Sequence, residues 1–219
     1  KGLSLEQFAF RRAKCAELTA LGDDQVLPER EFVEDLETAF VYGQDAVFSP
    51  SELQGLAQMV QKPIRMEGDT WFWQLPKPGA HYIVGADAAE GHLRGDNSAA
   101  IVLNDSKEQV AGYYGKCDPI AFGGFLDKLG RQYNNAYLVV EGYPGIGAVT
   151  AAILEQSFYP ALHYDDDHDE PGFRMGDMSR NQVKKAILES MRLGLVRVRD
   201  ERLLKELRAL VWYTRQNRE

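Results

Sequence analysis

Two apolar segments of this chain each end at an acidic side chain, and this feature most strongly limits the folds that the chain can adopt. Residues 82–86 (YIVGA) lead directly into Asp87, and residues 137–140 (YLVV) lead directly into Glu141. Both segments have the composition of buried β-strands. A carboxylate at the buried end of a strand costs free energy unless a partner compensates its charge. Each acid is therefore expected to face a partner at the edge of a sheet.

The order of the expected elements predicts an α/β fold built on a mixed sheet. Three strands with short connections are typical of an antiparallel meander, and the helices and strands that alternate after them are typical of parallel pairing. The expected strands are residues 82–86, 98–103, 109–116, 137–140 and 161–164, with a brief one at 196–198. The expected helices are residues 119–133 and 146–156, one capped by Ser179 that stops at Gly194, and one capped by Asp200. Helices are expected on both faces of the sheet.

The ends of the first and fourth strands predict a metal site. If these strands are neighbours that point the same way, Asp87 and Glu141 lie about 5 Å apart, one strand spacing. Two carboxylates this close repel each other unless a cation lies between them. Oxygen ligands suit Mg²⁺ or Mn²⁺, and two such ions about 4 Å apart can act on a phosphodiester. A turn-forming role for Asp87 stays open, and Asp96 can be either a ligand or a turn residue.

The glycines that follow Glu141 allow another interpretation. Gly142, Gly145 and Gly147 lie between a strand and a helix, with an acid, Asp165, further along, as in a dinucleotide-binding turn. Their spacing is G-x-x-G-x-G, which differs from the G-x-G-x-x-G that such a turn requires. The acid run that begins at Asp165 is more typical of a solvated loop than of a metal site.

The charge distribution bears on nucleic-acid binding. The net charge of −8 disfavours a nucleic-acid partner, but residues 174–219 hold 12 Lys and Arg against 6 Asp and Glu. Arg174, Arg180, Lys184 and Lys185 surround the start of an expected helix, where phosphate binds readily. DNA contact and ordinary surface charge both stay open for these four residues. The two cysteines lack ligand-spaced partners, and no apolar run is long enough to span a membrane.

These segments together resemble the nuclease domain of phage terminase large subunits, the motors that cut and package viral DNA. "PKPGAHYIVGADAAEGHLRGDNSAAIVLN" resembles the first acidic motif of that family, and "AYLVVEGYPGIGAVTAAIL" resembles the second. Residues 172–213 resemble the segment before the third motif. The resemblance implies a ribonuclease H-like fold in which Asp87 and Glu141 are metal-binding catalytic acids and Asp96 is a further acid of the first motif. The family's third acid is expected beyond Glu219.

The resemblance also implies a division of the chain and a function. Residues 1–75 are expected to connect to an upstream ATPase domain, and residues 76–219 to form the nuclease domain without its C-terminal end. The implied activity is metal-dependent endonuclease cleavage of double-stranded DNA, with two Mg²⁺ or Mn²⁺ ions, in the cytoplasm of an infected bacterium. The implied partners are the portal protein and the small terminase subunit. A non-catalytic DNA-gripping module and a nucleotide-binding phosphotransferase remain as alternatives.

Overall fold

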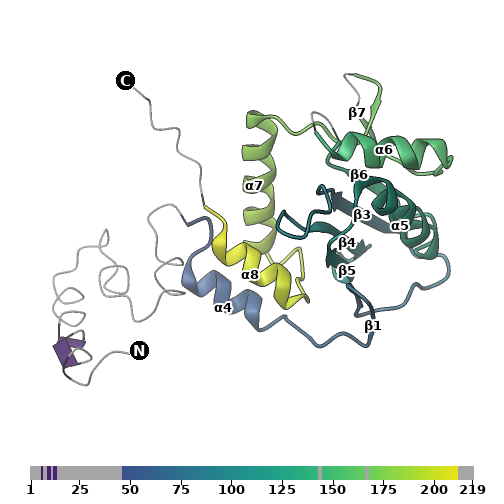
Figure 1. Ribbon diagram of the computed structural model, residues 1–219. Helices are drawn as coiled ribbons and strands as arrows, with labels where there is room; N and C mark the ends of the chain where they lie inside the picture. The colour runs from purple at the N-terminus through teal and green to yellow at the C-terminus, as the bar shows by residue number, and fades with distance from the viewer. Residues whose placement is uncertain are drawn as a thin grey trace, which may run out of the picture. The chain divides into compact units, whose positions relative to one another are not determined.

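The computed structural model describes residues 46–142, 145–165 and 168–211, together with Glu6, Ala9, Phe10, Arg12 and Ala13 (Figure 1). The chain forms two compact units, one of residues 1–58 and 203–219 and the other of residues 59–202. The spacing of apolar side chains in residues 3–18 also predicts a helix capped by Ser4. Most of this segment lies outside the described residues, although those described between 6 and 13 are helical.

Ser49 followed by Pro50 predicts the start of a helix, and in the first unit α4 (Pro50–Ala57) begins there. The Ser49 side chain accepts a hydrogen bond from the Glu52 N–H, and the Glu52 carboxylate accepts one from the Ser49 N–H, so the two residues form a capping box. The segment before α4 pairs with the segment after α8 (Glu201–Ala209) through an antiparallel bridge between Ala46 and Val211. The buried side chains of the two helices are Leu53, Leu56, Leu204 and Leu207.

The second unit contains a mixed sheet, as predicted, and this sheet has six strands. In spatial order its strands are β1 (Arg65–Glu67), β2 (Thr70–Phe72), β5 (Gln109–Gly115), β4 (Ser98–Asn104), β3 (Tyr82–Asp87) and β6 (Tyr137–Val140). β3 and β6 are parallel, and the other neighbouring strands are antiparallel. The predicted meander is thus β3, β4 and β5, and the return through a helix places β6 beside β3 (Figure 1).

The hairpin of β1 and β2, which precedes the other strands in the sequence, also belongs to this sheet. β2 pairs with β5, with Trp71 opposite Gly112, so residues 65–72 belong to the same sheet as the later strands. The compact unit accordingly starts at Met59. The loop composition of "PKPG" suggests a boundary near residues 75–80. The hairpin of β1 and β2 lies before this boundary.

One face of the sheet packs against α5 (Pro119–Gln132) and α6 (Gly147–Gln156) to form the core. Val84 of β3 lies between Val102 of β4 and Leu138 of β6, and all three are fully buried. Helix α5 begins at the Asp118 cap, whose carboxylate accepts hydrogen bonds from the N–H groups of Ile120 and Ala121. The helical residues of this core include Phe122, Leu126, Leu129 and Leu154.

The strand predicted at residues 161–164 is shorter than expected and forms two separate contacts. Leu162 forms a single parallel bridge with Leu138 of β6. The chain then leaves the sheet as a two-stranded hairpin, β7 (Tyr164–Asp165) and β8 (Glu170–Pro171), and returns where Phe173 bridges Glu141. The outer edge of β6 is therefore shared by two segments, because the hairpin interrupts the expected strand.

The predicted start of the next helix is also corrected. Helix α7 (Asp177–Arg192) has Gly176 as its N-cap, and Ser179 lies within its first turn. The Ser179 hydroxyl accepts a hydrogen bond from the Gly176 N–H, so it caps the helix from inside rather than from the N-cap position. The predicted stop is confirmed, since Gly194 follows the helix with a φ of +64°.

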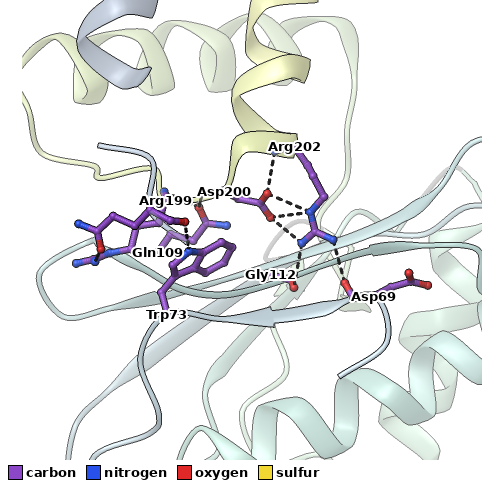
Figure 2. Close-up of polar contacts among 8 residues, drawn as sticks. Asp69, Trp73, Gln109, Gly112, Arg199, Asp200 and Arg202 are labelled. Atoms are coloured by element: carbon purple, nitrogen blue, oxygen red, sulfur yellow. Dashed lines mark hydrogen bonds and ion pairs between the residues drawn. The ribbon is translucent and has the colours of Figure 1, made fainter. Parts of the chain in front are cut away.

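The opposite face of the sheet carries Arg199, Asp200 and Arg202 (Figure 2). The strand predicted at residues 196–198 is reduced to one bridge, between Arg197 and Glu108. Asp200 caps α8 as predicted, since its carboxylate accepts the Arg202 N–H at 2.8 Å. The Arg202 guanidinium lies 3.8 Å from the centre of the Trp71 ring, and buried Gln109 accepts the N–H groups of residues 199 and 200. These contacts fix the point where the chain leaves the second unit.

Two adjacent glycines of α5 provide a matched test of the helix packing on this sheet. A Cβ at Gly123 would lie 2.8 Å from Ile153 of α6, whereas a Cβ at Gly124 would meet nothing within 4 Å. Gly124→Ala should stabilise the protein by about 0.5–1 kcal/mol, because it removes unfolded-state entropy without a clash. Gly123→Ala should destabilise it by about 1–3 kcal/mol through overpacking. Denaturant unfolding measures both changes, and equal effects at the two positions would contradict the close contact of α5 with α6.

Candidate metal-binding site

Parallel pairing brings Asp87 and Glu141 to the same edge of the sheet. Ala86 of β3 lies opposite Val140 of β6, so the residue that follows each of them is also a neighbour. The Glu141 N–H donates to the Ala86 carbonyl at 2.9 Å, which continues the ladder one residue past the end of β6. The predicted proximity of the two acids is therefore a direct result of the strand register.

The two carboxyl groups repel each other in a partly desolvated setting. The pKa of Glu141 is raised, first by the protein atoms that replace water around its carboxyl group and then by the charge of Asp87. The pKa of Asp87 is also raised, again mainly by desolvation, although its side chain remains accessible to solvent. Both shifts mark positions where a negative charge lacks full compensation within the protein.

Arg180 of α7 supplies part of that compensation. Its Nη2 atom lies 3.9 Å from Glu141 Oε1, and its charge lowers the pKa of both acids. The arginine side chain is 60% exposed, so solvent weakens this ion pair. The basic residues at the start of the helix predict Arg180 as a candidate DNA contact, but they do not predict its pairing with Glu141. The separation of the two residues in sequence leaves no local pattern for such a contact.

Asp96, the third predicted metal ligand, lies near Asp87. The Asp96 side chain is exposed, and its negative charge is the second cause of the raised pKa of Asp87. Its backbone carbonyl accepts a hydrogen bond from Lys116 Nζ at 2.9 Å. Within the part of the chain that the structure describes, no three His, Cys, Asp or Glu side chains gather closely enough to hold a metal ion.

The other predicted DNA contacts lie on or just before α7. Arg174 precedes the helix and is partly buried, as is Lys184, whereas Lys185 is exposed. Arg180 is the member of this group whose guanidinium reaches the acidic pair. The group therefore extends from the acidic pair along the first half of the helix.

The glycines after β6 serve backbone packing. A Cβ at Gly147 would lie 1.6 Å from the Glu141 carbonyl oxygen, and one at Gly142 would lie 3.1 Å from the Pro171 carbonyl oxygen. The first turn of α6 thus approaches the end of β6 more closely than a side chain allows. These contacts explain the two glycines without a bound phosphate, and they disfavour the dinucleotide interpretation.

The donor set fits a hard divalent cation. Two solvent-accessible carboxylates, both with raised pKa values, offer the oxygen ligands that Mg²⁺ and Mn²⁺ prefer. A bound cation would remove the repulsion between Asp87 and Glu141 and would leave coordination positions open for water or phosphate.

Solved structures of phage terminase nucleases align with this chain. The nuclease of the large terminase from thermophilic phage G20c, with bound magnesium, aligns with a TM-score of 0.62 and 21% identity over 78% of this chain and 83% of its own. The nuclease domain of the large terminase from Thermus phage P74-26 aligns with a TM-score of 0.58 and 22% identity over 74% of this chain and 79% of its own. The chain has the ribonuclease H-like fold of the phage large terminase nucleases.

The fold shared with these solved structures agrees with the resemblance of the two acidic motifs to terminase nucleases. The terminase nuclease of phage G20c has also been solved with bound cobalt and with bound zinc. No family model and no curated protein matches the chain. The relation to terminase nucleases therefore rests on the three-dimensional fold together with the two acidic motifs.

The repulsion between the two acids predicts a change in stability. Without divalent metal at pH 8, Asp87→Asn and Glu141→Gln should each raise the melting temperature by roughly 2 °C, because each removes one of two crowded charges. Thermal unfolding in EDTA measures the change. Asp105→Asn is the control and should give no increase, because Asp105 follows β4 at the end of the β3–β4 pair opposite Asp87. A lower melting temperature in both site variants would show that the pair is not under electrostatic strain.

Proposed function

We propose that this protein is the nuclease of a phage DNA-packaging motor and that it cuts double-stranded DNA with the help of divalent metal. The observation that carries this proposal is the adjacency of Asp87 and Glu141 at the ends of parallel strands in a terminase nuclease fold. Carboxylates in this arrangement are suited to phosphodiester hydrolysis with two metal ions. We propose Mg²⁺ or Mn²⁺ as the natural cation.

Asp87 and Glu141 would hold the metal. A divalent ion bound there supplies charge neutralisation and an acidified water molecule. The two carboxylates remain ionised when the ion is bound, so their raised pKa values do not block this role at neutral pH. A second ion needs ligands besides this pair.

Arg180 and its neighbours would position the DNA backbone. The Arg180 guanidinium is close to Glu141 and half exposed, so it can donate to a phosphate oxygen beside the acids. Arg174, Lys184 and Lys185 would contact further phosphates, which gives affinity without sequence preference.

No helix within the described residues is long and apolar enough to cross a membrane. We further propose that the portal protein and the small terminase subunit are partners and that the protein acts in the host cytoplasm.

A non-catalytic DNA-gripping module is a second candidate, because the described residues bring only two acids together. Calorimetry with Mn²⁺ separates the two candidates. A nuclease site should give a heat of binding that Asp87→Asn removes, whereas a gripping module should give no heat that depends on this acid.

Loss of one acid should abolish DNA cleavage. Asp87→Asn should reduce Mn²⁺-dependent nicking of supercoiled plasmid by at least about 100-fold while the protein stays folded, because the substitution removes a ligand charge. Arg180→Gln should weaken DNA binding more than the cleavage step, about tenfold in KM. Asp105→Asn is the matched control, since Asp105 follows β4 at the end of the β3–β4 pair opposite Asp87. Nicking by Asp87→Asn at the wild-type rate would refute the assignment.

A further inference from the structure

The loop that joins β3 to β4 displays an exposed leucine and an exposed arginine at the tip of a tight turn. The Gly95 N–H donates to the His92 carbonyl at 3.1 Å, which closes a turn with Leu93 and Arg94 at its centre. Leu93 is 91% exposed, the largest exposed fraction among the large apolar residues that the structure describes. Arg94 is exposed and has no ion pair with any described residue, whereas His92 pairs with Glu90 at 3.2 Å.

The base of this turn is fixed to the end of β5. Gly91, with a φ of +77°, lies so close to the backbone that a Cβ there would be 2.7 Å from the Asp118 nitrogen. The Lys116 ammonium donates to the carbonyls of Gly95 and Asp96 on the other side of the turn. Buried Ser98 accepts the N–H of Ala89 and donates to the Cys117 carbonyl. The exposure of Leu93 is therefore a feature of an anchored turn.

The turn also lies close to the acidic pair. It lies in the loop that leaves Asp87 at the end of β3 and returns, three residues after Asp96, at Ala99 of β4, which pairs with Asp87. Three residues span at most about 11 Å, so Leu93 lies within that distance of Asp96 along the backbone. DNA held with a phosphate at Asp87 and Glu141 would pass beside Leu93 and Arg94.

We propose that Leu93 and Arg94 enter the minor groove of the DNA beside the phosphate that is cut. This inference rests on the proposed function and adds an element that positions the duplex. The minor groove is about 6 Å wide and admits a narrow turn, whereas the major groove admits a helix or a two-stranded ribbon. Its negative potential attracts arginine, and leucine is one of the side chains that proteins wedge between base steps there. The turn offers both side chains at adjacent positions.

Binding to a 30-base-pair duplex in EDTA, followed by fluorescence anisotropy, tests the proposal without any contribution from metal or cleavage. Arg94→Gln should weaken binding and lower the slope of log Kd against log salt by about 1, because one phosphate-proximal charge is lost. Leu93→Asn should raise Kd about fivefold or more and leave the slope unchanged, because the lost contact is apolar. Binding within twofold of wild type and an unchanged slope in both variants would overturn the proposal.

Matched controls come from the far edge of the same sheet. Met66→Asn removes an exposed apolar side chain from β1, where Met66 is 58% exposed, and Lys62→Gln removes one exposed positive charge before that strand. Both should bind the duplex as wild type does. If they weaken binding as much as the turn variants, the effect is general and the assignment to the turn fails. Unchanged melting temperatures show that the substitutions leave the fold intact.

A minor-groove ligand such as netropsin identifies the groove. Netropsin should weaken binding of the wild-type protein to an A·T-rich duplex several-fold and have little effect on a Leu93→Asn, Arg94→Gln double variant. Absence of competition would overturn the minor-groove placement. Because these assays need no catalysis, a chain that binds through the turn but never nicks DNA refutes the proposed nuclease and supports this inference. If the chain nicks DNA and both turn variants bind DNA as wild type does, the proposed nuclease is supported and this inference is refuted.

Discussion

The parallel pairing of β3 with β6 is the constraint on which the candidate site depends. The pairing requires a crossover through α5, and the buried side chains of Val84, Leu138 and Val140 on the helix-covered face fix its register. A shift of one residue would move these side chains to the opposite face, and the loss of their burial in the core disfavours it. With the register fixed, Asp87 and Glu141 are neighbours whatever the chemistry of their side chains. The core therefore positions the acids, and the free energy gained by its burial offsets the repulsion between the two like charges.

The surroundings of the acidic pair show how the fold tolerates that cost. Arg180 approaches from α7, yet it is largely exposed and neutralises the pair only in part. The Lys116 ammonium donates to the carbonyls of Gly95 and Asp96 and so holds the β3–β4 loop. The remaining repulsion is what a bound cation would relieve. In the proposed nuclease, incomplete compensation by the protein is thus a requirement for metal binding.

The sequence predicts the central elements well because their signals are local. Apolar runs bounded by short polar connections define β3 to β6, and Asp200 caps its helix as its position suggests. The hairpin of β1 and β2 is missed in part because residues 65–67 are all exposed and show no alternation. The strand expected at 161–164 is interrupted by the β7–β8 hairpin, which only a contact far along the chain, between Phe173 and Glu141, closes. The same reason explains why the Arg180–Glu141 pair and the anchoring of the turn at Leu93 escape prediction.

The most direct test of this account is a crystal of the protein soaked in Mn²⁺, with anomalous difference density measured at the manganese edge. The account predicts a peak between the carboxylates of Asp87 and Glu141 that disappears in crystals of Asp87→Asn. Manganese bound elsewhere with no peak at this pair, or carboxylates that point away from each other, would contradict it.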